Sequence, residues 1–257
     1  AARTLPRHYT GQSNPTRVSR DTGGKTPHVL FAAAPHMDSA VGAVGFSIFR
    51  NTGEMCLAGS RLLVEQAAYD QVVARLEDVA ADWQPGDPLD PATKAGPVVD
   101  AEQLGRVTDY IDIGLEEGAR LVTGGGRTLE DTGGFFVEPT VFSGVDNSMR
   151  IAREEIFGPV LSVIPFADED EALRIANDTS IGLAAAVWTS NLARAHTMAR
   201  ELQAGTVWVN NFDQADISAP FGGFRQSGFG GKDKSLRAIE KYTNLKTTWI
   251  NLGRGGR

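Results

Sequence analysis

The sequence of 257 residues contains a single cysteine, Cys56. One thiol excludes an intramolecular disulfide framework and any zinc site that uses several thiolate ligands. A thiol that stays free suits a reducing compartment, so the composition predicts a cytoplasmic protein.

Long apolar runs and long basic runs are also missing. No apolar stretch approaches the ~20 residues that cross a bilayer, and the first residues show no charged segment followed by an apolar core. Acidic side chains outnumber basic ones by 32 to 25, which gives a net charge of -7. These features predict no membrane insertion and argue against nucleic-acid binding through phosphate neutralisation. A small molecule is the expected partner.

Two nucleotide-binding motifs are incomplete. Gly24-Lys25-Thr26 matches the end of a phosphate-binding P-loop, but Ser19 stands where the first glycine of that motif is required. The segment also precedes a strand pattern instead of following one. No G-x-G-x-x-G string lies between a strand and a helix, so a complete dinucleotide-binding fold is not evident in this chain. We therefore expect no nucleotide triphosphatase.

What the sequence does contain is a regular alternation of strand and helix patterns. The patterns predict strands at 26–32, 62–64, 120–122, 160–166, 183–188 and 206–209, and helices at 38–49, 72–83, 104–115, 168–176 and 192–202. Asp168 and Glu171 resemble a capping box, and Gly118 is placed to end a helix in a left-handed conformation. Such an alternation requires crossover connections, so it predicts an α/β fold with a mainly parallel sheet covered by helices on both faces.

The loop predicted at 210–231 is long and rich in glycine and aromatic residues. Ligands of parallel sheets bind at the carboxyl ends of the strands, so we expect this loop to be functional. A short helix at 235–241 and an edge strand at 246–250 are expected to follow it.

Cys56 lies between a glycine turn and a run of small residues. A substrate can approach such a thiol, and N–H groups around a turn can receive the negative charge that develops when a thiolate attacks a carbonyl. A buried structural cysteine is the alternative on these residues alone. A cysteine hydrolase would instead pair Cys56 with one of the four histidines, and no spacing singles out a partner: His8, His28, His36 and His196.

The segment from Phe49 to Arg61 resembles the active-site signature of the aldehyde dehydrogenase superfamily. It matches F-x-N-x-G-[QE]-x-C-x-A-x-S-R at every fixed place. The likeness extends over nearly all the chain, which is similar to the C-terminal half of such an enzyme, and it points to dehydrogenases of γ-glutamylated or free aminoaldehydes. The resemblance implies that Cys56 attacks an aldehyde, that a hydride passes to NAD or NADP, and that water hydrolyses the resulting thioester.

The same resemblance implies how the thiol and the water are activated. Turn N–H groups and a helix terminus would lower the pKa of Cys56 without a histidine. Asp21 stands where the family normally carries a glutamate, before a hydrophobe-Gly-Gly-Lys string, that activates the deacylating water. Here the string reads Asp21-Thr22-Gly23-Gly24-Lys25, and aspartate is one methylene shorter than glutamate. A solvated loop aspartate remains the alternative.

Five further residues match family positions. In Arg153-Glu154-Glu155-Ile156-Phe157-Gly158-Pro159, Glu155 would bind the nicotinamide ribose and Phe157 would pack near the nicotinamide. Asn210 would support the active site, and Phe221 would line the substrate tunnel. Asp216 would attract a cationic or polar substrate tail, with a solvated carboxylate as the alternative.

The expected domain organisation follows from the resemblance. Residues 1–22 would be a lead-in left from a missing cofactor domain, 23–240 the catalytic domain, and 241–257 an oligomerisation strand with a tail. The chain alone would then oxidise aldehydes weakly or not at all. A different class of function is an assembly module, in which the strand at 246–250 pairs with another subunit of a homo-oligomer.

Overall fold

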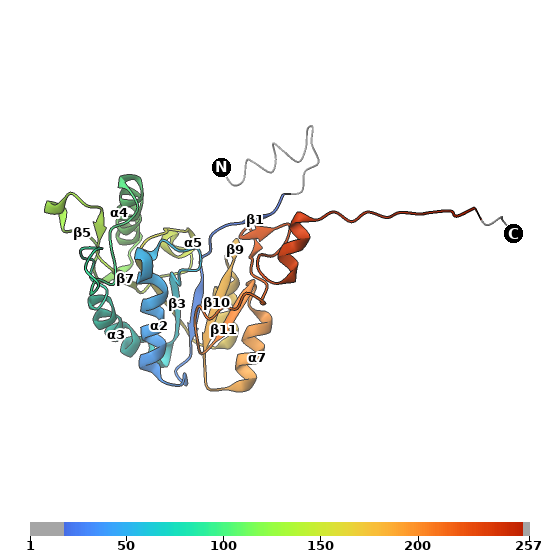
Figure 1. The fold of residues 1–257 in the computed structure, drawn as a ribbon. Coiled ribbons are helices and arrows are strands. Elements are labelled where there is room, and N and C mark those ends of the chain that lie inside the picture. The colour runs from blue at the N-terminus through green and yellow to red at the C-terminus, as the bar shows by residue number, and fades with distance from the viewer. Residues whose placement is uncertain (1–17, 254–257) are drawn as a thin grey trace.

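A seven-stranded sheet forms the core of the computed structural model, which describes residues 18–253 (Figure 1). The strands follow the order β11-β10-β2-β3-β8-β7-β4. Their bounds are β2 Pro27–Leu30, β3 Arg61–Glu65, β4 Arg120–Thr123, β7 Thr140–Ser143, β8 Val160–Phe166, β10 Ala184–Trp188 and β11 Thr206–Val209. Every pair in this sheet is parallel except β4 with β7. The predicted α/β fold with a mainly parallel sheet is confirmed.

Two short elements escape the sequence patterns. Strand β7 and the one-turn helix α5 (Arg150–Arg153) have four residues each, which is too short for a periodicity to show. The predicted strand at 120–122 does form, as the antiparallel edge strand β4.

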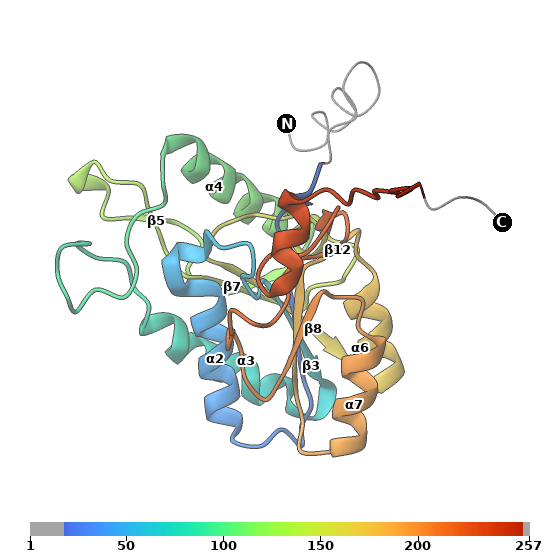
Figure 2. The same cartoon turned by 45° about the vertical axis from the view of Figure 1, so that its right-hand side comes forward.

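Helices cover both faces of the sheet, as predicted (Figure 2). Helices α2 (Met37–Phe49) and α3 (Tyr69–Ala81) pack on the face that Leu30, Leu62 and Val64 enter. Val29 and Leu63 point to the opposite face, because successive strand residues alternate in direction. The helices on that face are α4 (Ala101–Glu116), α5, α6 (Glu169–Asn177) and α7 (Leu192–Glu201). Within residues 18–253, no helix combines the length and apolar character that a bilayer crossing requires.

The predicted helix ends are present. At the start of α6, the Glu171 N–H donates to Asp168 Oδ1 at 2.9 Å and the Ala167 N–H donates to Glu171 Oε2 at 2.9 Å. This reciprocal pair is a capping box. Gly118 follows α4 with φ of +91°, a left-handed conformation that costs glycine little.

Residues 210–231 are less irregular than predicted. They contain β12 (Phe224–Arg225), which pairs with β9 (Ile181–Gly182), and β13 (Gly228–Phe229), which pairs with β1 (Arg20–Asp21). A third ribbon joins β5 (Arg127–Thr128) to β6 (Phe136–Val137). Three short 3-10 turns complete the connections: η1 (Arg50–Gly53), η2 (Gln66–Ala68) and η3 (Glu130–Thr132).

The C-terminal part departs from its prediction. The expected helix at 235–241 is the 3-10 helix η4 (Leu236–Tyr242), but residues 246–250 form no strand within the described part of the chain. They run away from the sheet with Trp249 92% exposed (Figure 1), and no strand within residues 18–253 pairs with them. Pairing with another subunit stays a prediction, as does the division into three regions. Residues 1–17 of the lead-in and 254–257 of the tail lie outside the described residues.

Candidate active site

Three segments meet at the amino ends of the neighbouring strands β2, β3 and β8. Gly23–Lys25 precede β2, Cys56 precedes β3, and Glu155–Phe157 precede β8. Their backbones touch: a Cβ on Gly24 would lie 3.0 Å from the Cys56 carbonyl oxygen, and a Cβ on Gly53 would lie 2.2 Å from the Gly158 carbonyl oxygen. Each of these segments is the connection by which the chain returns to begin a strand, whereas the expectation of function at the carboxyl ends concerned the loop at 210–231, which follows β11.

The Cys56 side chain is reachable. The residue is exposed and lies in a turn closed by the Ala58 N–H, which donates to the Met55 carbonyl oxygen at 3.0 Å. Partial desolvation raises the pKa of the thiol; the N–H groups of Cys56 and Leu57 oppose that rise, and the Glu155 carboxylate adds to it. The expected lowering of the Cys56 pKa is thus wrong for this chain, although the N–H groups that would receive an oxyanion do face the sulfur.

Glu155 lies against the glycine string that precedes β2. A Cβ on Gly23 would fall 1.7 Å from Glu155 Oε1, so a side chain at this position would displace the carboxylate. Burial raises the pKa of Glu155, while the Gly24 N–H and the Lys25 ammonium act in the opposite direction. Glu155 is also close enough to Cys56 for its charge to raise the pKa of the thiol.

Phe157 is held in a strained conformation beside Glu155. Its φ is +62°, which costs a non-glycine residue about 1–3 kcal/mol, and its ring is 38% exposed. Two side chains of α4 hold the backbone there. Gln103 Nε2 donates to the Phe157 carbonyl oxygen at 2.6 Å, and Arg106 Nε donates to the Ile156 carbonyl oxygen at 3.1 Å. Arg106 Nη2 also donates to the Glu155 carbonyl oxygen.

Two buried cations lie beneath the three segments. The Arg61 guanidinium is fully buried, and it donates to the carbonyl oxygens of Lys25, Ile175 and Ala176 at 3.0–3.1 Å. Lys25 is 2% exposed, and its Nζ has no hydrogen-bond partner in the described part of the chain. Burial, and then the Arg61 charge, lower the pKa of Lys25 to about 7. Arg61 thus holds the glycine string to the carboxyl end of α6, where a cation is favoured.

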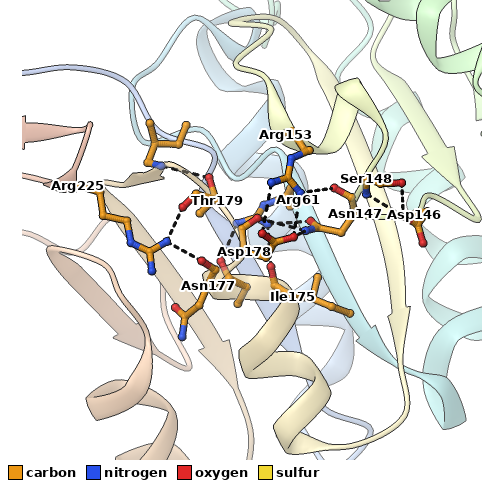
Figure 3. A network of polar contacts seen from close by, with 12 residues as sticks. Arg61, Asp146, Asn147, Ser148, Arg153, Ile175, Asn177, Asp178, Thr179 and Arg225 are labelled. Carbon is orange, nitrogen blue, oxygen red and sulfur yellow. Dashed lines mark hydrogen bonds and ion pairs between the residues drawn. The ribbon is translucent and has the colours of Figure 1, made fainter.

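The same guanidinium reaches the segment that carries Glu155 (Figure 3). Arg61 Nη1 donates to Asn147 Oδ1 at 3.1 Å, and Asn147 Nδ2 donates to Asp178 Oδ2 at 3.0 Å. Arg153, two residues before Glu155, donates to the same Asp178 oxygen at 2.9 Å. A chain of polar contacts therefore connects the last residue of the cysteine segment with the Glu155 segment.

Asp21 lies beside a second carboxylate. Burial raises the pKa of Asp21, and a hydrogen bond with Asp233 raises it further. Lys241 Nζ lies 3.7 Å from Asp21 Oδ2 and also pairs with Asp233. Asp21 and Cys56 are close enough for the Asp21 charge to raise the Cys56 pKa. Asp21 is an exposed residue of β1, so the solvated alternative stays open and the catalytic role of Asp21 stays a prediction.

Phe221 and Asn210 lie in different places. Phe221 exchanges two backbone hydrogen bonds with Asp233, both at 2.7 Å, so it lies beside the partner of Asp21. Asn210 follows β11 at the carboxyl end, and its amide bonds both the N–H and the carbonyl oxygen of Thr189, at 2.9 Å each. Asn210 thus connects the carboxyl ends of β10 and β11. Its predicted role in supporting the active site stays a prediction.

Asp216 caps its own turn. Asp216 Oδ1 accepts from the Ser218 N–H at 2.7 Å and from the Ser218 hydroxyl at 2.5 Å, and these bonds lower the pKa of Asp216. The side chain is exposed, which fits the solvated alternative as well as a substrate role.

The described histidines give no support to a cysteine hydrolase. His28 is buried in β2, its Nδ1 accepts from Trp188 Nε1 at 3.3 Å, and burial lowers its pKa to about 3. His36 begins α2, and His196 is exposed on α7. Within residues 18–253 no hydrogen bond joins Cys56 to these three histidines, and His8 lies outside the described residues.

Comparisons with known proteins agree with this geometry. The sequence profile described as "Aldehyde dehydrogenase family" matches residues 5–248. The chain belongs to the aldehyde dehydrogenase family. The NADP/NAD-dependent aldehyde dehydrogenase PuuC of Escherichia coli is 47% identical over 94% of this chain. That match covers 48% of PuuC, so the chain spans about half the length of the curated relatives it matches.

Solved structures of this aldehyde dehydrogenase family share the fold. An indole-3-acetaldehyde dehydrogenase in complex with NAD+ is 54% identical, with a TM-score of 0.94 over 98% of this chain and 50% of its own. A γ-glutamyl-γ-aminobutyraldehyde dehydrogenase from Burkholderia cenocepacia is also 54% identical, with a TM-score of 0.92 over 95% of this chain and 49% of its own. The predicted family resemblance is confirmed.

The structure adds residues to this aldehyde dehydrogenase site that the sequence patterns do not identify. Asp233 and Lys241 contact Asp21 from more than 200 positions away, so no local spacing could connect them. Gln103 and Arg106 lie on a helix predicted only as amphipathic. The sequence did contain a signal for Arg61. A charged residue directly before the apolar run Leu62–Val64 is expected to be buried with that strand, and a buried charge requires hydrogen-bond partners.

Proposed function

We propose that this chain is the catalytic portion of an NAD(P)-dependent aldehyde dehydrogenase in which Cys56 is the nucleophile. The observation that carries the proposal is the position of Cys56: exposed, with N–H groups directed at its sulfur, and close to both Glu155 and Asp21. A free thiol suits a cytoplasmic location.

Cys56 Sγ would attack the aldehyde carbon, and the carbonyl oxygen would take the negative charge beside the Cys56 N–H. After oxidation of this thiohemiacetal to a thioester, water would attack the thioester carbon. Asp21 would accept a proton from that water, and the acid and the free thiol would be released. The raised pKa of Asp21 supports this role, because a base with a pKa nearer to neutrality accepts a proton more readily.

NAD or NADP would supply the hydride acceptor. The residues before β8 fit the nicotinamide end of such a cofactor, since the Glu155 carboxylate can accept hydrogen bonds from ribose hydroxyl groups and Phe157 presents an exposed ring. The relatives support the assignment: PuuC is named NADP/NAD-dependent, and a structural relative was solved with NAD+.

The proposed substrate is a small aldehyde that carries an amino group, as the name of the Burkholderia relative suggests. Asp216 would attract a cationic tail. If Asp216→Ala leaves the preference for aminoaldehydes over simple aliphatic aldehydes unchanged, Asp216 does not have this role.

The test separates the thiol chemistry from the full reaction. We expect p-nitrophenyl acetate to acetylate the chain at Cys56, which intact-mass measurement detects, and Cys56→Ser to abolish the adduct. We expect little NAD(P)H from the chain with an aldehyde, because half the length of the relatives is not matched by it. If p-nitrophenyl acetate does not acetylate Cys56, the proposed nucleophile is wrong. If the chain produces NAD(P)H rapidly from an aldehyde, the expected weak dehydrogenase activity is wrong.

A second candidate function is assembly into a homo-oligomer. It is favoured by the extended C-terminal segment, where Leu245, Trp249 and Leu252 are 86–100% exposed. Such a segment can add a strand to a partner's sheet. Sedimentation that shows only monomer counts against it.

A further inference from the structure

Three arginines from distant parts of the chain meet around the end of α6 and the turn at 177–180 that joins it to β9 (Figure 3). Arg61 belongs to β3, Arg153 to α5 and Arg225 to β12. Cations that converge in this way require acceptors between them. The end of the helix supplies carbonyl oxygens, and the turn supplies one carboxylate, that of Asp178.

The Asp178 carboxylate binds Arg153 with both oxygens. Asp178 Oδ2 accepts from Arg153 Nη1 at 2.9 Å, and Asp178 Oδ1 accepts from Arg153 Nη2 at 3.3 Å. Two such bonds fix the plane of the guanidinium group as well as its distance. Arg153 is two residues before Glu155, and the residue between them is extended. The contact therefore anchors the chain directly before Glu155.

The same carboxylate is connected to the cysteine segment through Asn147. Asn147 Nδ2 donates to Asp178 Oδ2 at 3.0 Å, while Asn147 Oδ1 accepts from Arg61 Nη1 at 3.1 Å. The amide thus has one orientation, because its nitrogen serves Asp178 and its oxygen serves Arg61. Burial lowers the pKa of Arg61 to about 10, and the Asp178 charge opposes that fall. Arg61 lies five residues after Cys56.

Arg225 connects the turn to the glycine string. Arg225 Nη1 donates to the Asn177 carbonyl oxygen at 2.6 Å. Ser227, two residues further on, donates through Oγ to the Gly23 carbonyl oxygen at 2.8 Å. Gly23 follows Asp21 by two residues, so the third segment of the proposed site is tied to the same turn.

We propose that Asp178 is a positioning residue that holds Glu155 and Cys56 at a fixed separation. Arg153 transmits its position to the Glu155 segment, and Arg61 transmits it to the cysteine segment. The side chains of Asp178 and Arg153 are 52% and 43% exposed, so their contact contributes little to stability and acts mainly on geometry. The inference rests on the proposed function of Cys56 and adds a residue to the same site.

Removing the charge of Glu155 measures how close this side chain is to Cys56. Besides desolvation, the Glu155 charge raises the pKa of the Cys56 thiol, and that effect weakens as the two side chains move apart. We define the Glu155 factor as the rate of Cys56 alkylation by iodoacetamide at neutral pH with Glu155→Gln, divided by the rate without it. In the reaction the Cys56 thiolate attacks the methylene carbon, a C–S bond forms and iodide leaves. Intact mass gives both rates, and the direct effect of a second substitution on the thiol cancels in the ratio.

Asp178→Asn should reduce the Glu155 factor. We expect a factor of roughly two to five in the wild-type chain and of roughly one to 1.5 with Asp178→Asn, because Glu155 is no longer held near the sulfur. Arg153→Gln removes the other half of the same contact and should reduce the factor equally. The two substitutions together should reduce it no further, since they act through one contact. Asp178→Glu keeps a carboxylate and should restore part of the factor.

Asp146→Asn is the matched control. It removes the same charge directly before Asn147, where the Asp146 carboxylate accepts from the Ser148 N–H at 2.8 Å and from the Ser148 hydroxyl at 2.6 Å. This variant should leave the Glu155 factor unchanged. Thermal unfolding of each variant separates positioning from stability. If Asp178→Asn lowers the unfolding midpoint and leaves the factor unchanged, its role is structural and the proposal is wrong.

The remaining outcomes separate this proposal from the proposed function. If Cys56 is labelled and the Glu155 factor is the same with Asp178→Asn and with Arg153→Gln as in the wild-type chain, Asp178 does not position the pair and the nucleophile survives. A factor of one in the wild-type chain means that Glu155 does not act on the thiol, and it overturns the inference as well. If iodoacetamide labels Cys56 in none of these chains, the reachable nucleophile of the proposed function fails too.

Discussion

Lys25 and Arg61 are two cationic side chains buried close to each other, and both the burial and the repulsion between like charges are unfavourable. Burial, and then the Arg61 charge, lower the pKa of Lys25 to about 7, and burial lowers the pKa of Arg61 to about 10. Arg61 is compensated by its carbonyl partners, but Lys25 has only the charges of Glu155 and Glu154 in its favour. Lys25 is therefore the buried group whose charge should matter most to pH dependence.

We predict that Lys25→Met stabilises the chain at neutral pH and that the gain disappears in base. The folded-state pKa is about 7 and the ordinary value is 10.5, so the unfolded chain binds more protons between these limits and wild-type stability rises with pH there. The slope from this one group is at most ~1.4 kcal/mol per pH unit. Denaturant unfolding across that window checks it, and equal slopes for the two proteins contradict it.

Cys56 offers a second residue-scale prediction. Because desolvation and the Glu155 carboxylate raise the thiol pKa, labelling by iodoacetamide should rise with pH through a midpoint above that of an ordinary thiol. Glu155→Gln removes a negative charge and should lower the midpoint, which speeds labelling at neutral pH by roughly two- to fivefold. Glu154→Gln is the matched control, since Glu154 is bound by Arg150 and Tyr110. A midpoint that does not move with Glu155→Gln argues against this contact.

At the scale of elements, α6 connects the site to the sheet. Its amino end is closed by Asp168, and its carboxyl end receives the Arg61 guanidinium. The helix therefore depends on two polar contacts of opposite sign, each at the terminus where the helix dipole favours it.

We predict that Asp168→Ala lowers the free energy of unfolding by about 1 kcal/mol, the usual cost of a lost N-cap. Asp170→Ala, in the same first turn but without a cap hydrogen bond, should cost less. Thermal and denaturant unfolding of both variants measure the difference. Equal losses would mean that general charge at the helix start matters and the specific cap does not.

Sequence patterns predicted the long helices and strands because the spacing of apolar residues within each of them reveals its type. The capping box of α6 and the left-handed Gly118 were confirmed for the same reason, since both are local. Strand order and the short β7 depend on partners elsewhere in the chain, which no local pattern encodes. The rule for loops after strands was applied to residues 210–231, which do follow β11, and it gave no position for the segments that precede β2, β3 and β8.

The candidate site was predictable where a contiguous motif carries it. The motifs brought Cys56, Glu155 and Asp21 into one region, which the pKa effects among them support. Asp233, Lys241 and Asp178 reach the region through long-range contacts and were missed. Their recognition required the fold, since charge complementarity between distant residues leaves no spacing to read.

In the described part of the molecule, helices cover both faces of the sheet, whereas the C-terminal segment is exposed to solvent. Lys241 contacts Asp21, so η4 belongs with the site, while the residues beyond Tyr242 extend away from it (Figure 2). The predicted boundary at residue 241 lies within η4, and Leu245, Trp249 and Ile250 beyond this helix are 74–100% exposed.

We predict that a chain ending at Tyr242 keeps its thermal unfolding midpoint, because Leu245, Trp249 and Ile250 are 74–100% exposed and pack on little within the described chain. If the segment drives assembly, the shortened chain should sediment as a smaller species than the full chain. Trp249→Ser with Ile250→Ser keeps the length and serves as the companion variant. A fall in the unfolding midpoint of the monomer contradicts the expected independence.

The gathering of Cys56, Glu155 and the glycine string at one set of strand ends leaves the opposite rim available for engineering. The turn at 32–36 joins β2 to α2 on that rim, and its alanines are largely solvated. A reporter peptide or an immobilisation handle grafted there should leave thiol chemistry intact, whereas the same graft just ahead of β3 would push the reactive sulfur out of register with its neighbours.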